Sequence, residues 1–79
     1  MSLVINGISI PDDCTVLEGL TYLHVYFKGL RDSTKELLES IQDESVYVSY
    51  VDDEEFYEYS NARIIYLGNN TIYVSSWIN

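Results

Sequence analysis

The sequence predicts a small α+β fold in a single domain, residues 1–79, with an N-terminal β-hairpin and helical segments packed on a three- to four-stranded antiparallel C-terminal sheet. Three observations lead to this prediction: an Asn-Gly pair between two short apolar runs, a helical spacing of apolar residues in the middle of the chain, and an alternating pattern after residue 45. Hydrophobic residues make up 47% of the chain and aromatic residues 14%, far above the composition of disordered chains. We therefore expect a folded core.

The predicted hairpin is centred on Asn6-Gly7, which separates the apolar runs at residues 3–5 and 8–10. Asn-Gly favours a two-residue hairpin turn because both central positions need a positive φ. Pro11 ends the second run, since proline and the two aspartates after it favour a turn.

Residues 15–30 fit two patterns. Apolar residues recur there at helical spacings of three and four: Val16, Leu20, Leu23, Phe27 and Leu30. Residues 21–27 are instead dense in β-branched and aromatic side chains that alternate as in a strand, and Gly19 and Gly29 bracket them. We favour the helix because the helical spacing continues into the following segment.

Residues 33–42 carry the clearest helical signal. Asp32 or Ser33 can cap the helix, and Glu36 stands three residues after Ser33, as in a capping box. The apolar face of this helix consists of Leu37, Leu38 and Ile41.

From Ser45 onward the chain is predicted to form an antiparallel meander. The expected strands are residues 46–51, 56–59, 63–67 and 71–78. The turns between them are expected at Asp52-Asp53, at Ser60-Asn61 and at Gly68-Asn69-Asn70.

A short leucine-rich-repeat-like solenoid is the alternative architecture. Two segments fit the apolar spacing of such repeats: Leu20-x-x-Leu23-x-Val25-x4-Leu30 and Ala62-x-x-Ile65-x-Leu67-x-x-Asn70-x-Ile72. Val46 and Val48 would belong to the middle repeat strand, between these two segments. The first segment has Lys28 where the repeat asparagine should stand, so the α+β fold is preferred.

The charge balance is strongly acidic: four Lys+Arg stand against thirteen Asp+Glu, for a formal net charge of −9. This excludes direct, sequence-independent nucleic-acid binding, which needs cations to displace counterions from phosphates, and polybasic membrane binding. The single cysteine, Cys14, rules out an internal disulfide and suits a reducing compartment. With no signal-peptide or membrane-span pattern, the expected location is cytoplasmic, or the host cytoplasm for a viral protein.

No motif indicates an enzyme, a cofactor or a metal site. The sequence has no phosphate-binding loop, paired-histidine zinc motif, nucleophile elbow or EF-hand spacing. Cys14 and His24 lack a third residue to orient the imidazole. Four consecutive acids at residues 52–55 would point alternately to opposite sides and would not converge on one ion. We therefore expect no catalytic residue, no cofactor and no dedicated metal site.

The acidic residues are concentrated in one part of the chain. Nine of them lie between Glu36 and Asn61, where no Lys or Arg occurs, and aromatic residues are interleaved with them. The structural interpretation is that these acids form a solvated helix face and a charged turn, which keeps an edge strand from aggregating. The functional interpretation is a binding surface, since tyrosine is enriched at interfaces. The candidate partner-binding residues are Asp52, Asp53, Glu54, Glu55, Tyr57, Glu58 and Tyr59.

These features predict a small acidic, non-catalytic protein-binding module. Its partner would be a basic, nucleic-acid-handling protein, which it would inhibit or engage as a nucleic-acid mimic, with carboxylates in the place of phosphates. A virus or a mobile element is the expected source. The alternative is a structural or assembly protein, such as a small virion or scaffold subunit, that forms a homodimer or larger assembly through its aromatic C-terminal strand. That strand would contribute Tyr73, Val74, Trp77 and Ile78.

Overall fold

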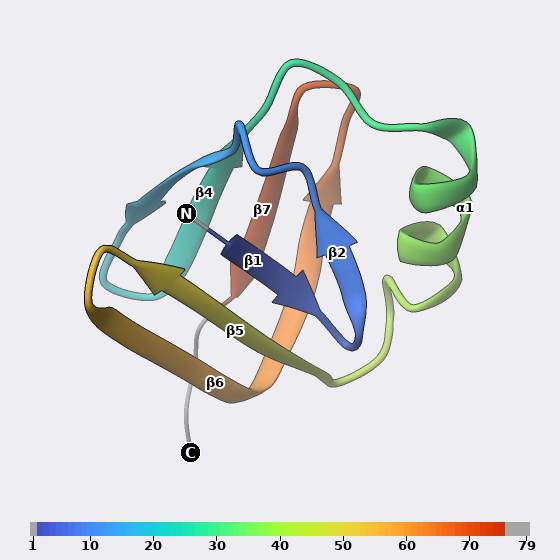
Figure 1. Ribbon diagram of the computed structural model, residues 1–79. Helices are drawn as coiled ribbons and strands as arrows, with labels where there is room; N and C mark the ends of the chain where they lie inside the picture. The colour runs from blue at the N-terminus through green and yellow to red at the C-terminus, as the bar shows by residue number, and fades with distance from the viewer. Residues whose placement is uncertain (1, 76–79) are drawn as a thin grey trace.

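The computed structural model describes residues 2–75 and contains seven β-strands and one α-helix (Figure 1). In chain order the elements are β1 (Ser2–Ile5), β2 (Ile8–Ile10), β3 (Thr15–Glu18), β4 (Tyr22–Tyr26), α1 (Asp32–Ser40), β5 (Val46–Asp52), β6 (Glu55–Leu67) and β7 (Thr71–Ser75). The strands form one antiparallel sheet in the order β2-β1-β5-β6-β7-β4-β3.

The long strand β6 divides this sheet into two halves. Its first part pairs with β5 and its second part pairs with β7. We call β2, β1, β5 and residues 55–62 of β6 the N-terminal half-sheet, and residues 63–67 of β6 with β7, β4 and β3 the C-terminal half-sheet. Figure 1 shows β1 passing in front of β7, and β2 passing in front of the second part of β6. The two half-sheets therefore face each other, with the core between them.

Two β-bulges in β6 explain how the sheet turns back on itself. Val46 pairs with Ala62 and Val48 with Tyr59, so β6 carries one residue more than β5 over this stretch. Ile65 is a second extra residue, inserted between the pairs that β6 forms with β7. Because a bulge bends its strand and increases the local twist, two bulges in one strand fold the sheet over the core.

The core is built from the inward positions of both half-sheets. The buried side chains are Leu3, Ile5, Ile10, Cys14, Leu23, Val25, Phe27, Leu38, Val46, Val48, Tyr50, Ala62, Ile64, Ile72 and Val74. Among the described residues, no charged side chain is buried with them. The regular alternation of buried and exposed positions along the strands follows from the two-residue period of a strand.

The single helix confirms the prediction for residues 33–42. Helix α1 connects β4 to β5, contacts β2, and inserts Leu38 fully into the core. The predicted cap is wrong: Arg31 occupies the N-cap position and makes no side-chain capping hydrogen bond. No helix in residues 2–75 is long and apolar enough to cross a membrane.

The predicted fold class is wrong, because the chain is mostly a seven-stranded antiparallel sheet with one short helix. Residues 15–30, for which we favoured a helix, form the β3–β4 hairpin around Gly19. Leu23 and Val25 point into the core, while the helical spacing would have buried Leu20, which is fully exposed. The β-branched and aromatic content of this segment and its pairing with β7 decide in favour of strands.

The C-terminal strands also differ from the prediction. The strands expected at residues 56–59 and 63–67 are one continuous strand, and the turn expected at Ser60-Asn61 is the first bulge of β6. The leucine-rich-repeat-like alternative is wrong as well, since such repeats stack parallel strands and every pairing here is antiparallel. Trp77 and Ile78 lie outside the described residues.

The Asn6-Gly7 turn confirms the predicted hairpin. Asn6 and Gly7 have φ angles of 52° and 85°, and Ile5 pairs with Ile8 across the turn. The backbone N–H of Asn6 also donates to the carbonyl oxygen of Tyr47 at 2.7 Å, which ties the turn to β5.

Replacing Gly7 by alanine should lower the free energy of unfolding by about 1–2 kcal/mol, because an L-residue is strained at a positive φ. Gly29→Ala is the matched control, since Gly29 has a φ outside the left-handed region and no neighbour within 4 Å of an added Cβ. Urea unfolding followed by circular dichroism measures both variants. Equal losses in the two would contradict the role assigned to this turn.

Candidate functional site: an acidic β-hairpin

The seven candidate binding residues all lie on the β5–β6 hairpin. Asp52 ends β5, Glu55 begins β6, and the two are paired across the turn formed by Asp53 and Glu54. Asp53 adopts a φ of 55°, which aspartate tolerates better than most residues. All four carboxylates are exposed, and Figure 1 shows this hairpin tip on the opposite side of the molecule from α1.

The strand period places the candidate residues on both faces of the hairpin. Glu58 pairs with Ser49 and points outward, away from the core. Tyr57 and Tyr59 point to the inner face, opposite Tyr50 and Val48 respectively. The sequence therefore located the hairpin correctly, but the seven residues do not form one continuous surface.

The outer face carries apolar side chains next to the acids. Val51 and Phe56 form an exposed cross-strand pair, with 40% and 58% of their surfaces accessible. The Tyr47 hydroxyl donates a hydrogen bond to the Glu58 carboxylate on the same face. We call Tyr47, Val51, Phe56 and Glu58 the outer hairpin patch. Sequence reasoning missed Tyr47, Val51 and Phe56 as site residues, although their alternation with buried positions of β5 and β6 placed them on the side of Glu58.

The inner face holds a network that joins the two half-sheets. Glu18, at the end of β3, accepts hydrogen bonds from the hydroxyls of Tyr50 and of Tyr59, the latter at 3.5 Å. The rings of Tyr50 and Tyr57 are stacked, with centroids 4.6 Å apart. The Tyr57 hydroxyl donates to Glu55. We call Glu18, Tyr50, Tyr57 and Tyr59 the tyrosine clasp. Glu18 is 32 residues from Tyr50 along the chain, so no local sequence pattern indicated it.

Two carboxylates, Glu18 of the clasp and the neighbouring Glu55, accept hydrogen bonds from the phenols of the clasp and keep them protonated. Burial and the hydrogen bond to Glu18 raise the pKa of Tyr50 well above its ordinary range. The hydrogen bond to Glu55 raises the pKa of Tyr57 to about 12. Burial, followed by the charge of Glu18, raises the pKa of Tyr59 as well. The clasp is therefore a set of neutral donors held by two carboxylates, and it positions the hairpin on the C-terminal half-sheet.

The basic side chains do not neutralise the hairpin. The Lys35 ammonium donates to Asn69 Oδ1 at 2.8 Å, and the Arg63 guanidinium donates to the carbonyl oxygen of Asp43 at 3.2 Å. Both acceptors are uncharged, and Lys28 and Arg31 lie in the connection between β4 and α1. The negative charge of residues 52–58 is thus directed to the solvent.

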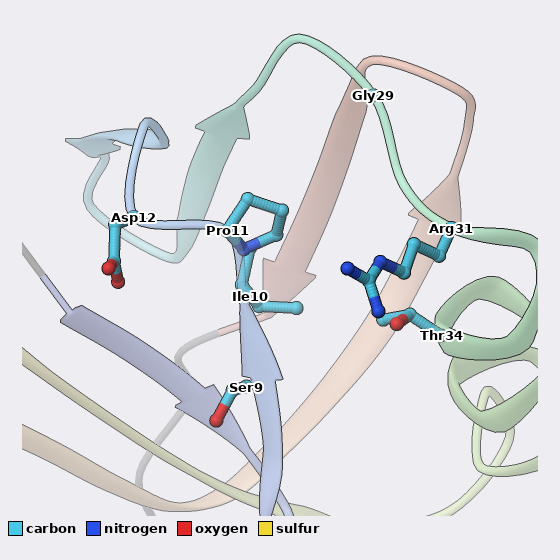
Figure 2. Close-up of a pocket in the computed structure, with 7 residues that line it drawn as sticks. All are labelled: Ser9, Ile10, Pro11, Asp12, Gly29, Arg31 and Thr34. Atoms are coloured by element: carbon cyan, nitrogen blue, oxygen red, sulfur yellow. The ribbon is translucent and has the colours of Figure 1, made fainter.

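A surface hollow of ≈ 480 Å³ lies between the end of β2 and the start of α1. Its lining residues are Ser9, Ile10, Pro11, Asp12, Gly29, Arg31 and Thr34. Figure 2 shows Asp12 and Arg31 on opposite sides of Pro11, with the Arg31 side chain extending toward Pro11 and the Asp12 carboxylate on the far side of it. The hollow therefore offers no convergent acid–base pair.

The two residues considered for nucleophilic chemistry are separated by the sheet. Cys14 is buried in the core, and this burial raises the pKa of its thiol. His24 lies on the outward face of β4, where its ring stacks on Tyr73. Within residues 2–75, no three His, Cys, Asp or Glu side chains are grouped closely enough to hold a metal ion.

Compared with protein-family models, with curated proteins and with solved structures, the chain matches none.

Proposed function

We propose that the protein is a small acidic binding module that docks its β5–β6 hairpin on a basic protein and has no catalytic role. The observation that carries this proposal is the outer hairpin patch, in which an exposed Val51–Phe56 pair stands beside Glu58 and the acidic tip. Such a surface supplies an apolar anchor and a negative field at the same place.

The acids and the apolar pair would act at different stages of binding. Carboxylates at the tip attract a positively charged surface from a distance and raise the association rate. Phe56 is exposed enough to enter a pocket on the partner, and a buried aromatic anchor mainly slows dissociation.

Basic grooves on proteins are commonly built to hold phosphates. A hairpin with five carboxylates at residues 52–58 can occupy such a groove in place of a nucleic acid, and it would then inhibit the partner by competition. The tyrosine clasp supports this role, because it holds the hairpin in one conformation and so reduces the entropy lost on binding.

The test compares two charge-reversal variants that carry the same net charge. Glu54→Lys/Glu58→Lys alters the hairpin, whereas Glu36→Lys/Glu39→Lys alters exposed positions of α1. The immobilised wild-type chain captures proteins from a cell lysate, and these are identified by mass spectrometry. A purified captured protein is then titrated with the wild type and with each variant at low and high salt. We expect the partner to be a nucleic-acid-binding protein whose labelled oligonucleotide is displaced by the wild-type chain.

The hairpin variant should lose at least about tenfold in affinity, or about 1.4 kcal/mol, while the helix variant binds nearly as the wild type does. Equal losses would mean that bulk charge alone drives the interaction. Unchanged binding by the hairpin variant would refute the proposed site.

Phe56→Ala provides a second measurement on the same complex. It should raise the dissociation rate while leaving the salt dependence of association unchanged, because it removes the anchor and keeps every charge. A change confined to the association rate would contradict the role given to Phe56.

A further inference from the structure

The outward face of the C-terminal half-sheet carries a continuous group of ring side chains. We call it the aromatic face, and it consists of Tyr22, His24, Tyr26, Tyr66 and Tyr73. The five residues come from three adjacent strands, β4, β7 and β6. Within it, the rings of His24 and Tyr73 are stacked with centroids 4.0 Å apart, and the rings of Tyr66 and Tyr73 are 5.3 Å apart.

This composition is unusual for a face that no other part of the described chain covers. The outward positions of an antiparallel sheet with one solvated face are normally polar. Here Tyr66 leaves 50% of its surface exposed, and Leu17, which pairs with His24 across β3 and β4, leaves 55% exposed. Helix α1 does not cover them, since it packs on β2 and inserts Leu38 into the core, on the opposite face of the sheet from these side chains.

The aromatic face also lacks the negative charge that dominates the rest of the molecule. Residues 19–31 and 59–79 contain no Asp or Glu, although the whole chain has thirteen, and they contain Lys28, Arg31 and Arg63. The nearest acid on the neighbouring strand, Glu18, is turned inward to the tyrosine clasp. The protein therefore has an acidic side at the β5–β6 hairpin and an acid-free side at the aromatic face.

We propose that the aromatic face is the interface of a homodimer, in which two copies pack β4, β7 and β6 against each other about a twofold axis. Two chains that each carry a net charge of −9 repel one another, so a close contact is favourable only where carboxylates are absent. A twofold axis brings the same rings of both copies together, and tyrosine and histidine rings form favourable stacked and edge-to-face pairs with their own kind.

A second copy fits the surface better than a nucleic acid does. Exposed rings can stack on bases, but single strands also need a positively charged groove, and the net charge of −9 opposes that binding. The dimer would leave both β5–β6 hairpins free, because they belong to the N-terminal half-sheet. This inference therefore does not depend on the proposed function of the hairpin.

The size of the face sets the expected strength of the dimer. Aromatic side chains carry about 150–250 Å² each. Tyr22, Tyr26 and Tyr66 are 39%, 41% and 50% exposed, and His24 and Tyr73 are less exposed, so each copy offers on the order of 300–400 Å². That is about half of a standard interface. We therefore expect a dissociation constant in the micromolar range, where monomer and dimer are both populated.

Sedimentation velocity over about 1–200 µM protein, which brackets the expected dissociation constant, tests the proposal at low and high NaCl. We expect a monomer–dimer equilibrium that shifts toward the dimer as salt rises, because salt screens the repulsion between two acidic chains and leaves ring contacts intact. Tyr66→Glu should abolish the dimer. Phe56→Glu is the matched control, since it adds the same charge to an equally exposed aromatic site on the hairpin and should leave dimerisation unchanged.

Three results would overturn the proposal. A strict monomer at the highest concentration would exclude a homodimer through the aromatic face. A dimer that weakens as salt rises, or that Phe56→Glu abolishes, would indicate head-to-tail docking of the acidic hairpin instead. A Tyr66→Glu or Tyr26→Glu variant that retains the wild-type melting temperature and still dimerises would exclude this face as the interface.

Discussion

Replacing Ile72 by alanine is expected to lower the free energy of unfolding by about 2–5 kcal/mol. Ile72 has no exposed surface, and it pairs with Val25 on one side and with Leu67 on the other, at the centre of the C-terminal half-sheet. A domain of this size has a total stability of about 4–12 kcal/mol, so the variant should lose a large share of it and unfold at a much lower urea concentration than the wild type. The loss combines the removed apolar surface with the cavity left in a core that cannot collapse fully.

Two further variants show whether the loss comes from the core. Ile72→Val removes one methyl group and should cost about 0.5–1.5 kcal/mol. Ile65→Ala removes the same atoms as Ile72→Ala from an exposed bulge position of β6 and should change stability by less than about 0.5 kcal/mol. Urea unfolding monitored by circular dichroism gives the three values. Similar losses for Ile72→Ala and Ile65→Ala would contradict the placement of Ile72 in the core and of Ile65 on the surface.

Alkaline pH is expected to unfold the protein through the tyrosine clasp. The folded state raises the pKa of Tyr50, and that of Tyr57 to about 12, whereas an unfolded chain releases phenol protons near the ordinary value of about 10. Their stabilising contribution is therefore complete below pH 10. It is lost as the pH rises from about 10 through the raised pKa values of the folded state.

The buried Tyr50 sets the slope of this loss. While its phenol stays protonated in the folded state and ionises in the unfolded chain, stability falls by at most about 1.4 kcal/mol for each pH unit. Tyr50→Phe removes that slope and costs about 1 kcal/mol at neutral pH through the lost hydrogen bond to Glu18. Glu18→Gln keeps an acceptor but removes the charge, so it should reduce the alkaline loss while changing neutral stability less than Tyr50→Phe.

Urea unfolding at pH 7, 9, 10 and 11 would measure the effect, because these values lie on both sides of the ordinary tyrosine pKa of about 10. Parallel losses in the wild type and in Tyr50→Phe above pH 10 would show that Tyr50 is not the origin of the alkaline sensitivity.

Local signals predicted the elements that depend on neighbouring residues. Asn6-Gly7 forms the expected turn because the positive φ angles are a property of those two residues. Helix α1 forms in the predicted segment, but of the three residues of the predicted apolar face only Leu38 is fully buried, while Ile41 is the partly buried C-cap and Leu37 is exposed. A turn forms at the acidic tip as the composition indicated, but one residue later than predicted, at Asp53 and Glu54, because Asp52 still pairs with Glu55.

The errors lie where two periodicities competed or where a strand bends. Residues 15–30 satisfied a helical spacing and a strand alternation together, and the pairing of β4 with β3 and β7 selected the strand. Ser60-Asn61 has the composition of a turn, yet a bulge accommodates it inside β6. Both choices depend on hydrogen bonds to strands distant in the sequence, which no local window contains.

The candidate site was likewise predicted only in part. The sequence indicated an acidic hairpin with tyrosines around it, but the period of two places Tyr57 and Tyr59 inside the clasp and Phe56 outside. Strand β7, which we considered for self-association by edge pairing, lies between β6 and β4 and has no free edge. Any self-association through it must use the side chains of the aromatic face.

By itself, the sequence determined that this chain folds, that it carries a net charge of −9, and that its acids gather on one segment rich in tyrosine. Only the tertiary structure decided that the acids and the exposed rings occupy different sides of the molecule. The reason is the order of strands, which places Tyr73 between His24 and Tyr66 and turns Glu18 toward Tyr50. Composition and local turns can be read from the sequence, because they depend on residue types and on neighbouring residues. A surface depends on strands that are distant in the sequence and become neighbours only when the sheet closes over its core.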